Sequence, residues 1–300
     1  IIQSVIDGTR TGKEAAIALN ISERQVWRKV KSVRENGSIG VKHKNHFHKP
    51  HHTIPIHIRN KIIQLKLSPM YQDTNFSHFK ELLQENENIS ISYTSVYRIL
   101  TSYGIKSKKK HKERKIHRRR KRKEFEGDLV QADGTPFDWF QDGHMYSLHG
   151  LIDDATSKVL GLYMCEHECL LGYLEVTRQM LTNYGSPRCL YPDKYSVFFP
   201  SCSQKVTIEE QLEGKTKPTT QFGRIMDFLG IEMVPASSSQ AKGRIERLWE
   251  TLQDRLVTEF KLHGIKTIEQ ANEFLPKYIK KHNQKFSVSP AKSDSKFIPI

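Results

Sequence analysis

Three acidic residues, Asp133, Asp193 and Glu246, stand at positions where they could hold metal ions together. Asp133 follows a predicted strand at 127–132, Asp193 follows another at 188–191, and Glu246 lies in the first turns of a long predicted helix. Carboxylates gathered in one place repel each other, and hard divalent cations such as Mg²⁺ or Mn²⁺ relieve that repulsion. A pair of such ions can activate a nucleophile and stabilise a leaving oxygen in phosphoryl transfer.

Each of these acids also has a purely structural interpretation. Asp133 and Asp193 fit turn positions at strand ends, and Glu246 fits the first turn of a helix, where it would complement the helix dipole. Two further acids, Asp153 and Asp154, are interpreted as the turn between the second and third strands. Residue types alone therefore leave both interpretations open for each acid.

The elements that would position these acids are predicted from hydrophobic periodicity in the segment 126–283. Strands are predicted at 127–132, 145–152, 159–166, 188–191 and 231–234, and helices at 170–181, 222–229 and 241–262. This order predicts a mixed sheet with helices on its faces. Because strand ends at one edge of such a sheet bring distant residues together, we expect Asp133 and Asp193 to meet there.

Three motifs surround the acids: LVQADGT at 129–135, YPDKYSVF at 191–198 and PASSSQAKGRIER at 235–247. Together they resemble the DDE transposases and retroviral integrases, and most of all bacterial insertion-sequence transposases of the ISNCY type. The resemblance implies an α/β, RNase H-like catalytic core at 125–283. It implies that Asp133, Asp193 and Glu246 are both catalytic residues and ligands of two divalent metal ions, Mg²⁺ or Mn²⁺.

The sequence departs from the family pattern after the second Asp and in the last helix. Lys194 replaces the usual Asn or Gly, and Gln253 stands where many relatives carry Lys or Arg. The interval between Asp193 and Glu246 is longer than in many relatives, and the extra length is assigned to a loop at 200–218. Phosphate contacts are expected instead from nearby basic residues: Lys242, Arg244 and Arg247.

The first 41 residues predict a helix-turn-helix, with Ser22 as the N-cap of the second helix. Val26 and Val30 would share one face of that helix. Other faces carry the basic residues expected to bind DNA: Arg24, Arg28 and Lys31. The alternative is a small helical hairpin with a solvated basic face.

A His-rich segment at 42–54 is interpreted as a linker, with a metal site as the alternative. Three helical stripes at 55–105 predict an all-α domain that resembles a second helix-turn-helix, and plain helical packing is the alternative. Ser92 is expected to cap the last of these helices.

The segment 106–124 is the strongest run of positive charge in a chain whose formal net charge is +15. A solvated linker is one interpretation, and binding of the DNA backbone is the favoured one. The residues expected to bind DNA there are Lys108, Lys109, Lys110, Arg118, Arg119 and Arg120.

These features predict a transposase that binds element ends and carries out metal-dependent DNA strand cleavage and strand transfer. The expected partners are double-stranded DNA and further copies of the chain, with no membrane, in a cytoplasmic, nucleoid-associated setting. The alternatives are a catalytically inactive DNA-binding regulator and an RNase H-like nuclease. The segment 284–300 is expected to be a C-terminal tail that stops short of a further domain.

Overall fold

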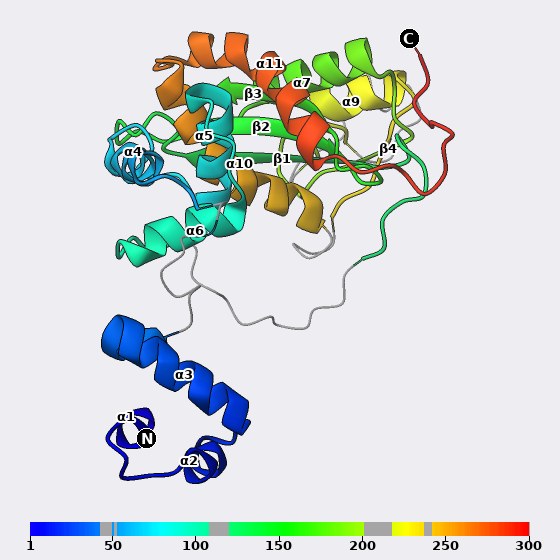
Figure 1. The fold of residues 1–300 in the computed structure, drawn as a ribbon. Helices are drawn as coiled ribbons and strands as arrows, with labels where there is room; N and C mark the ends of the chain where they lie inside the picture. The colour runs from blue at the N-terminus through cyan, green and yellow to red at the C-terminus, as the bar shows by residue number, and fades with distance from the viewer. Residues whose placement is uncertain (43–49, 51–52, 108–119, 201–217, 237–241, 300) are drawn as a thin grey trace. The chain divides into compact units, whose positions relative to one another are not determined.

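The computed structural model describes residues 1–42, 50, 53–107, 120–200, 218–236 and 242–299. The chain forms two compact units, Ile1–Asn60 and Lys61–Ile300, and each is described by itself (Figure 1). Within the described parts of both units, no helix is long and apolar enough to cross a membrane.

Residues 1–42 of the first unit form α1 (Ile2–Ile6), α2 (Gly12–Leu19), α3 (Glu23–Asn36) and the short 3₁₀ helix η1 (Gly37–Val41). Asn20 ends α2 in the left-handed conformation, with φ 51°, and Ser22 then caps α3. The Ser22 hydroxyl accepts from Gln25 N while Gln25 Oε1 accepts from Ser22 N, which is a reciprocal capping box. Val26 and Val30 are buried beneath α1 and α2, so the predicted helix pair and its cap are confirmed.

The second unit is built on a five-stranded mixed sheet in the order β3-β2-β1-β4-β5. Its strands are β1 (Val130–Phe137), β2 (Tyr146–Asp153), β3 (Val159–Cys165), β4 (Cys189–Tyr191) and β5 (Glu232–Met233). The pairs β1–β2 and β2–β3 are antiparallel, whereas β1–β4 and β4–β5 are parallel. This topology confirms the predicted α/β, RNase H-like class.

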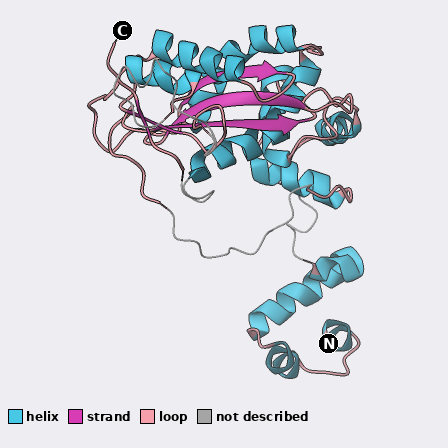
Figure 2. Cartoon of the chain, turned by 180° about the vertical axis from the view of Figure 1, so that it is seen from behind, coloured by secondary structure: helices cyan, strands magenta, loops and turns pink. Residues whose placement is uncertain are grey.

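Helices cover both faces of the sheet (Figure 2). One apolar cluster joins it to α7 (Leu170–Asn183) and α9 (Gln221–Phe228), and the other joins it to α10 (Gly243–Leu262) and α11 (Ile268–Phe286). The helix α11 was not predicted. Pro276 lies inside it, and proline normally breaks a helical pattern.

The prediction that Asp133 ends the first strand is wrong. All of β1 pairs with β2, with Asp133 opposite Gly150 and Phe137 opposite Tyr146. The other neighbour, β4, pairs with β1 only as far as Gln131. Asp133 therefore lies inside β1, at a position where the pairing with β2 continues and the pairing with β4 has already ended.

The helices at 55–105 are α4 (Ile56–Leu67), α5 (Phe76–Glu87) and α6 (Tyr93–Ser102). Ser92 caps α6 as predicted, because its hydroxyl accepts from Ser95 N. The helix α5 contacts α10 and α11 directly. Its Glu81 pairs with Arg255 at 2.6 Å, and its Glu85 pairs with Lys281 at 2.8 Å. From Lys61 onward, this helical segment is part of the same compact unit as the sheet.

Candidate active site

Asp133 lies on β1, and Asp193 lies two residues beyond the end of β4, which is parallel to β1. The last paired positions are Gln131 and Tyr191, and each acid lies two residues further along its own chain. Parallel strands lie about 4.8 Å apart, so this register brings both acids to the same level of the sheet. The register is consistent with the expected meeting of the first two acids, which stays a prediction.

A third carboxylate, Glu168, lies beside this pair in the segment between β3 and α7. Burial raises its pKa most, and the charges of Asp133 and Asp193 raise it further, against a hydrogen bond from the Tyr173 hydroxyl that lowers it. Glu168 packs directly on Gly134, where an added Cβ would come within 3.0 Å of the Glu168 carboxyl carbon. Sequence analysis missed Glu168, although an acid three residues beyond a strand end was a signal that could have found it.

The helix α10 is attached to Asp133 through two side chains. Lys242 Nζ donates to Asp133 Oδ1 at 2.6 Å, and Trp249 Nε1 donates to Asp133 Oδ2 at 2.9 Å. Further along α10, Gln253 Nε2 donates to Thr135 Oγ1 of β1 at 3.4 Å. This face of α10 therefore runs along β1, past the catalytic candidate Asp133.

Glu246 lies between the two residues that hold Asp133. It comes three residues before Trp249, so these two share one side of the helix, and four residues after Lys242, which immediately precedes α10. The Glu246 side chain is exposed, and its neighbours along the helix axis both reach Asp133.

The predicted DNA-binding residues fall into three groups. Arg24, Arg28 and Lys31 are exposed on α3, and Arg247 is exposed on α10. Three others form ion pairs within the core: Lys242 with Asp133, and both Arg120 and Arg244 with Asp154. The remaining ones lie outside the described residues: Lys108, Lys109, Lys110, Arg118 and Arg119. Contact with DNA stays a prediction for all of them.

Two predictions about loops fall mostly on segments that are not described. The His-rich segment 42–54 and the loop 200–218 lie largely outside the described residues.

The turn interpretation of Asp153 and Asp154 is confirmed, because Asp153 ends β2 and accepts from Thr156 N and Oγ1, both at 2.7 Å. Both acids are fully buried, at 0% exposure.

Among the described residues, no group of three or more His, Cys, Asp or Glu side chains is arranged to hold a metal ion. The donor chemistry nevertheless fits a hard cation, because Asp133 offers carboxylate oxygens, one of which accepts the Lys242 ammonium in this structure. Asp193 presents a second carboxylate, one oxygen of which accepts from Tyr195 N at 3.2 Å. Carboxylate oxygens of this kind suit Mg²⁺ or Mn²⁺.

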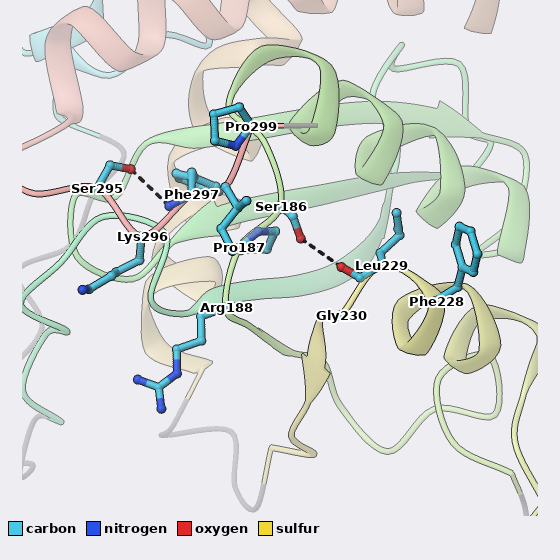
Figure 3. Close-up of a pocket in the computed structure, with 11 residues that line it drawn as sticks. Ser186, Pro187, Arg188, Phe228, Leu229, Gly230, Ser295, Lys296, Phe297 and Pro299 are labelled. Atoms are coloured by element: carbon cyan, nitrogen blue, oxygen red, sulfur yellow. Dashed lines mark hydrogen bonds between the residues drawn. The ribbon is translucent and has the colours of Figure 1, made fainter.

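A surface pocket elsewhere on the second unit holds none of these acids (Figure 3). The C-terminal segment forms one wall where Ile298 exchanges backbone hydrogen bonds of 2.8 and 2.9 Å with Ser186. Its other walls come from the start of β4, including Arg188, and from the end of α9, including Phe228 and Leu229. The pocket reflects how the C-terminal segment packs, and the candidate active site lies in another part of the fold.

Comparison with known proteins gives a family. The chain is 35% identical, over 95% of its own length and 67% of the relative's, to the transposase for insertion sequence IS1202 of Streptococcus pneumoniae. The chain belongs to the insertion-sequence transposase family. A second relative of the family, y4bF of Sinorhizobium fredii, is named as a candidate transposase; it is 34% identical over the whole chain and 64% of its own length.

The transposase chain thus spans about two thirds of the length of these curated relatives. No protein-family model matches it. Among solved structures, the HTLV-2 integrase catalytic core domain in complex with magnesium is similar, with 15% identity and a TM-score of 0.40 over 56% of this chain and 92% of that one. The simian T-cell lymphotropic virus intasome is similar over 71% of this chain and 66% of that one, with 15% identity and a TM-score of 0.37.

Proposed function

We propose that this transposase is a DDE-type polynucleotidyl transferase whose catalytic acids are Asp133, Asp193 and Glu246. The observation that supports the proposal is the register of β1 and β4, whose last paired positions, Gln131 and Tyr191, each lie two residues before one of the two aspartates. Membership of the transposase family supports the DNA substrate. The attachment of α10 and its N-cap to Asp133 supports the role of Glu246, which lies in the chain between the N-cap Lys242 and Trp249 of the helix.

The three acids would hold two divalent metal ions, Mg²⁺ or Mn²⁺. Bound at such a site, the ions activate an oxygen nucleophile and neutralise charge on the phosphoryl group being transferred. The residues of the chain hold the carboxylates in position. Trp249 holds the Asp133 carboxylate of β1, and the buried Trp249 ring packs beside Gly150 of β2, which keeps α10 against the sheet.

The proposed reaction has two stages with the same chemistry. Water first attacks the phosphodiester at the element end and leaves a 3′-hydroxyl. That hydroxyl then attacks the target DNA by direct transesterification, and the displaced 3′-oxygen of the target strand is the leaving group. The reaction forms no covalent bond between DNA and protein. Because two element ends must be held together, we expect the chain to act as a multimer.

DNA binding is assigned to the basic surfaces outside the acidic site. The exposed Arg24 and Arg28 of α3 would recognise element ends, since α3 is the second helix of a helix-turn-helix. Arg247, exposed one residue after Glu246, would contact phosphate near the site. Because each phosphate contact releases counterions, binding should weaken steeply with salt.

The test is strand transfer of a labelled element-end duplex in Mg²⁺ by the intact transposase and by three single variants: Asp133→Asn, Asp193→Asn and Glu246→Gln. Each variant should lose strand transfer and keep its affinity for the duplex. Glu250→Gln, an exposed acid one turn further along α10, serves as the matched control and should stay active.

Two outcomes would favour other functions. End binding without cleavage by the wild type would favour a DNA-binding regulator. Cleavage of RNA–DNA hybrids without strand transfer would favour an RNase H-like nuclease.

A further inference from the structure

Asp154, just after β2, is the centre of a buried network that the proposed chemistry does not use. Its carboxylate accepts hydrogen bonds at 2.9 Å from Gln131 Nε2 and from the backbone nitrogen of Lys123. It also forms ion pairs with Arg120 and, at 3.2 Å, with Arg244. A buried carboxylate with these partners is held in one orientation, because rotating it would leave buried charges unpaired.

Two of these partners lead to the start of α10. Arg244 is the second residue of the helix, and its Nε also donates to the Asp154 carbonyl oxygen at 2.7 Å. Gln131 uses its amide as a bridge, since its Nε2 donates to Asp154 while its Oε1 accepts from Ile245 N at 3.1 Å. The Ile245 N–H is one of the first helix amides, which have no partner inside the helix. The next residue is Glu246.

The other partners lead to the end of the basic segment 106–124. Arg120 and Lys123 both contact the Asp154 carboxylate, one through its side chain and one through its backbone. The Arg120 guanidinium also lies 5.9 Å from the centre of the Tyr191 ring, at the end of β4. The end of the basic segment is therefore anchored to the Asp154 carboxylate, which also holds the start of α10.

The adjacent Asp153 makes a separate set of hydrogen bonds. Asp153 itself accepts from Thr156 N and Oγ1, and from Gly127 N at 2.9 Å. Its partners lie in the turn and at the start of the core segment, whereas the Asp154 partners lie on α10, β1 and the basic segment. The two acids are equally buried, and their carboxylates bind different parts of the fold.

We propose that Asp154 is a positioning residue of the strand-transfer site, which fixes the start of α10 and joins it to the end of the basic segment. The inference rests on the proposed function for its catalytic meaning, because the residue it positions is Glu246. Its structural content, a link between Asp154 and the first turn of α10, can be measured without any activity.

Hydrogen exchange of the intact, DNA-free protein tests that link. Asp154→Asn should speed exchange at least tenfold in peptides covering 243–248. The matched control, Asp153→Asn, makes the same chemical change at the neighbouring buried position and should speed exchange at Gly127 and Thr156 instead. Unchanged exchange at 243–248 in folded Asp154→Asn would overturn the proposal.

A second variant covers the case in which Asp154→Asn does not fold. Gln131→Leu keeps the Asp154 ion pairs and removes both hydrogen bonds of the Gln131 bridge, the one to Asp154 and the one from Ile245 N. It should produce the same rise in exchange at 243–248, and the absence of that rise would also contradict the proposal.

Single-turnover strand transfer at saturating DNA separates positioning from folding. Asp154→Asn should lower the rate at least tenfold and leave the dissociation constant for the end duplex within twofold, while Asp153→Asn keeps its rate. If both variants lose rate, and the loss follows the fall in their Tm, the positioning role is overturned. If the wild type itself shows no strand transfer, the proposed function fails, and the exchange result still decides whether Asp154 holds α10.

Discussion

The ammonium nitrogen of Lys242 lies 2.6 Å from Oδ1 of Asp133, with 7% of the Lys242 side chain exposed. Contact of Lys242 with DNA stays a prediction, and in this structure the ammonium pairs with a catalytic candidate. An ammonium and a divalent ion carry the same sign of charge and compete for one carboxylate oxygen. We expect a metal ion that binds this oxygen to displace Lys242, which would free its charge for a phosphate of the DNA.

The first prediction follows from that competition. Lys242→Met should lower the Tm of the metal-free protein and increase the rise in Tm that Mg²⁺ produces. Loss of one partner from a fully buried pair costs about 3–5 kcal/mol. The cost is smaller here because the Asp133 side chain is 21% exposed. Mg²⁺ bound to the unpaired carboxylate would restore stability by mass action.

A thermal melt as a function of Mg²⁺ concentration makes the measurement, with Lys292→Met as the control. Lys292 pairs with Glu124 at 2.7 Å in an exposed ion pair. If Mg²⁺ raises the Tm of wild type and Lys242→Met equally, Lys242 does not compete with the metal.

Glu168→Gln should weaken Mg²⁺ binding while the fold stays intact. Glutamine keeps an oxygen that can accept from the Tyr173 hydroxyl, but the negative charge beside Asp133 and Asp193 is lost. A loss of about 1.4 kcal/mol of attraction would raise the half-saturating Mg²⁺ concentration for strand transfer about tenfold. Glu166→Gln, an exposed acid two residues away, should leave it unchanged, and equal Mg²⁺ curves for both variants would contradict the prediction.

Gly150→Ala should destabilise the transposase and impair its site. Gly150 lies opposite Asp133 on β2, and an added Cβ would come 2.6 Å from the Trp249 ring. Overpacking of this kind costs about 1–3 kcal/mol. It would also shift the indole away from the Asp133 carboxylate. Urea unfolding and strand transfer measure the two effects. Gly243→Ala, with no atom within 4 Å of its added Cβ, is the control for stability.

Stability should fall as the pH drops from about 6.5 toward 4. Burial lowers the pKa of both His149 and His282 from 6.5 to about 4, so the unfolded chain binds more protons in this window. The contribution is complete above pH 6.5 and is lost progressively below it, at a cost on the order of 3 kcal/mol for each histidine. Burial also raises the pKa of Glu259, but hydrogen bonds from His78 and Lys281 outweigh it and lower that pKa to about 2, so Glu259 stays ionised in this window.

Urea unfolding at pH 7, 6 and 5 measures this slope, and His282→Phe provides the comparison. Phenylalanine removes one titrating group and should roughly halve the slope. A slope that is the same in both proteins would show that His282 does not take part.

Replacement of Arg24 and Arg28 by Ala on α3 should weaken binding to element ends and leave the Tm unchanged, because both side chains are exposed. If each contacts a phosphate, the salt dependence of log K should lose about two units of slope. The matched pair Lys277→Ala and Lys280→Ala removes the same charge from exposed positions on α11. Equal loss of affinity in both double variants would mean that α3 has no special role.

Local features of this protein were determined by the sequence alone. Ser22 and Ser92 cap their helices as predicted, because a capping hydrogen bond joins residues three apart in the chain. Asp193 follows the short strand β4 as predicted, and the order of strands and helices through α10 follows from hydrophobic period. The family motifs around Asp133, Asp193 and Glu246 were likewise visible in the sequence.

Contacts between distant segments were decided only by the tertiary structure. The length of β1 depends on its pairing with β2, which carries Asp133 into the strand interior. The pairing of Lys242 with Asp133 joins residues more than 100 positions apart, and the network around Asp154 joins three separate segments. A pattern in sequence reports which face of an element is apolar, but the partner of a buried charge depends on which elements the fold brings together.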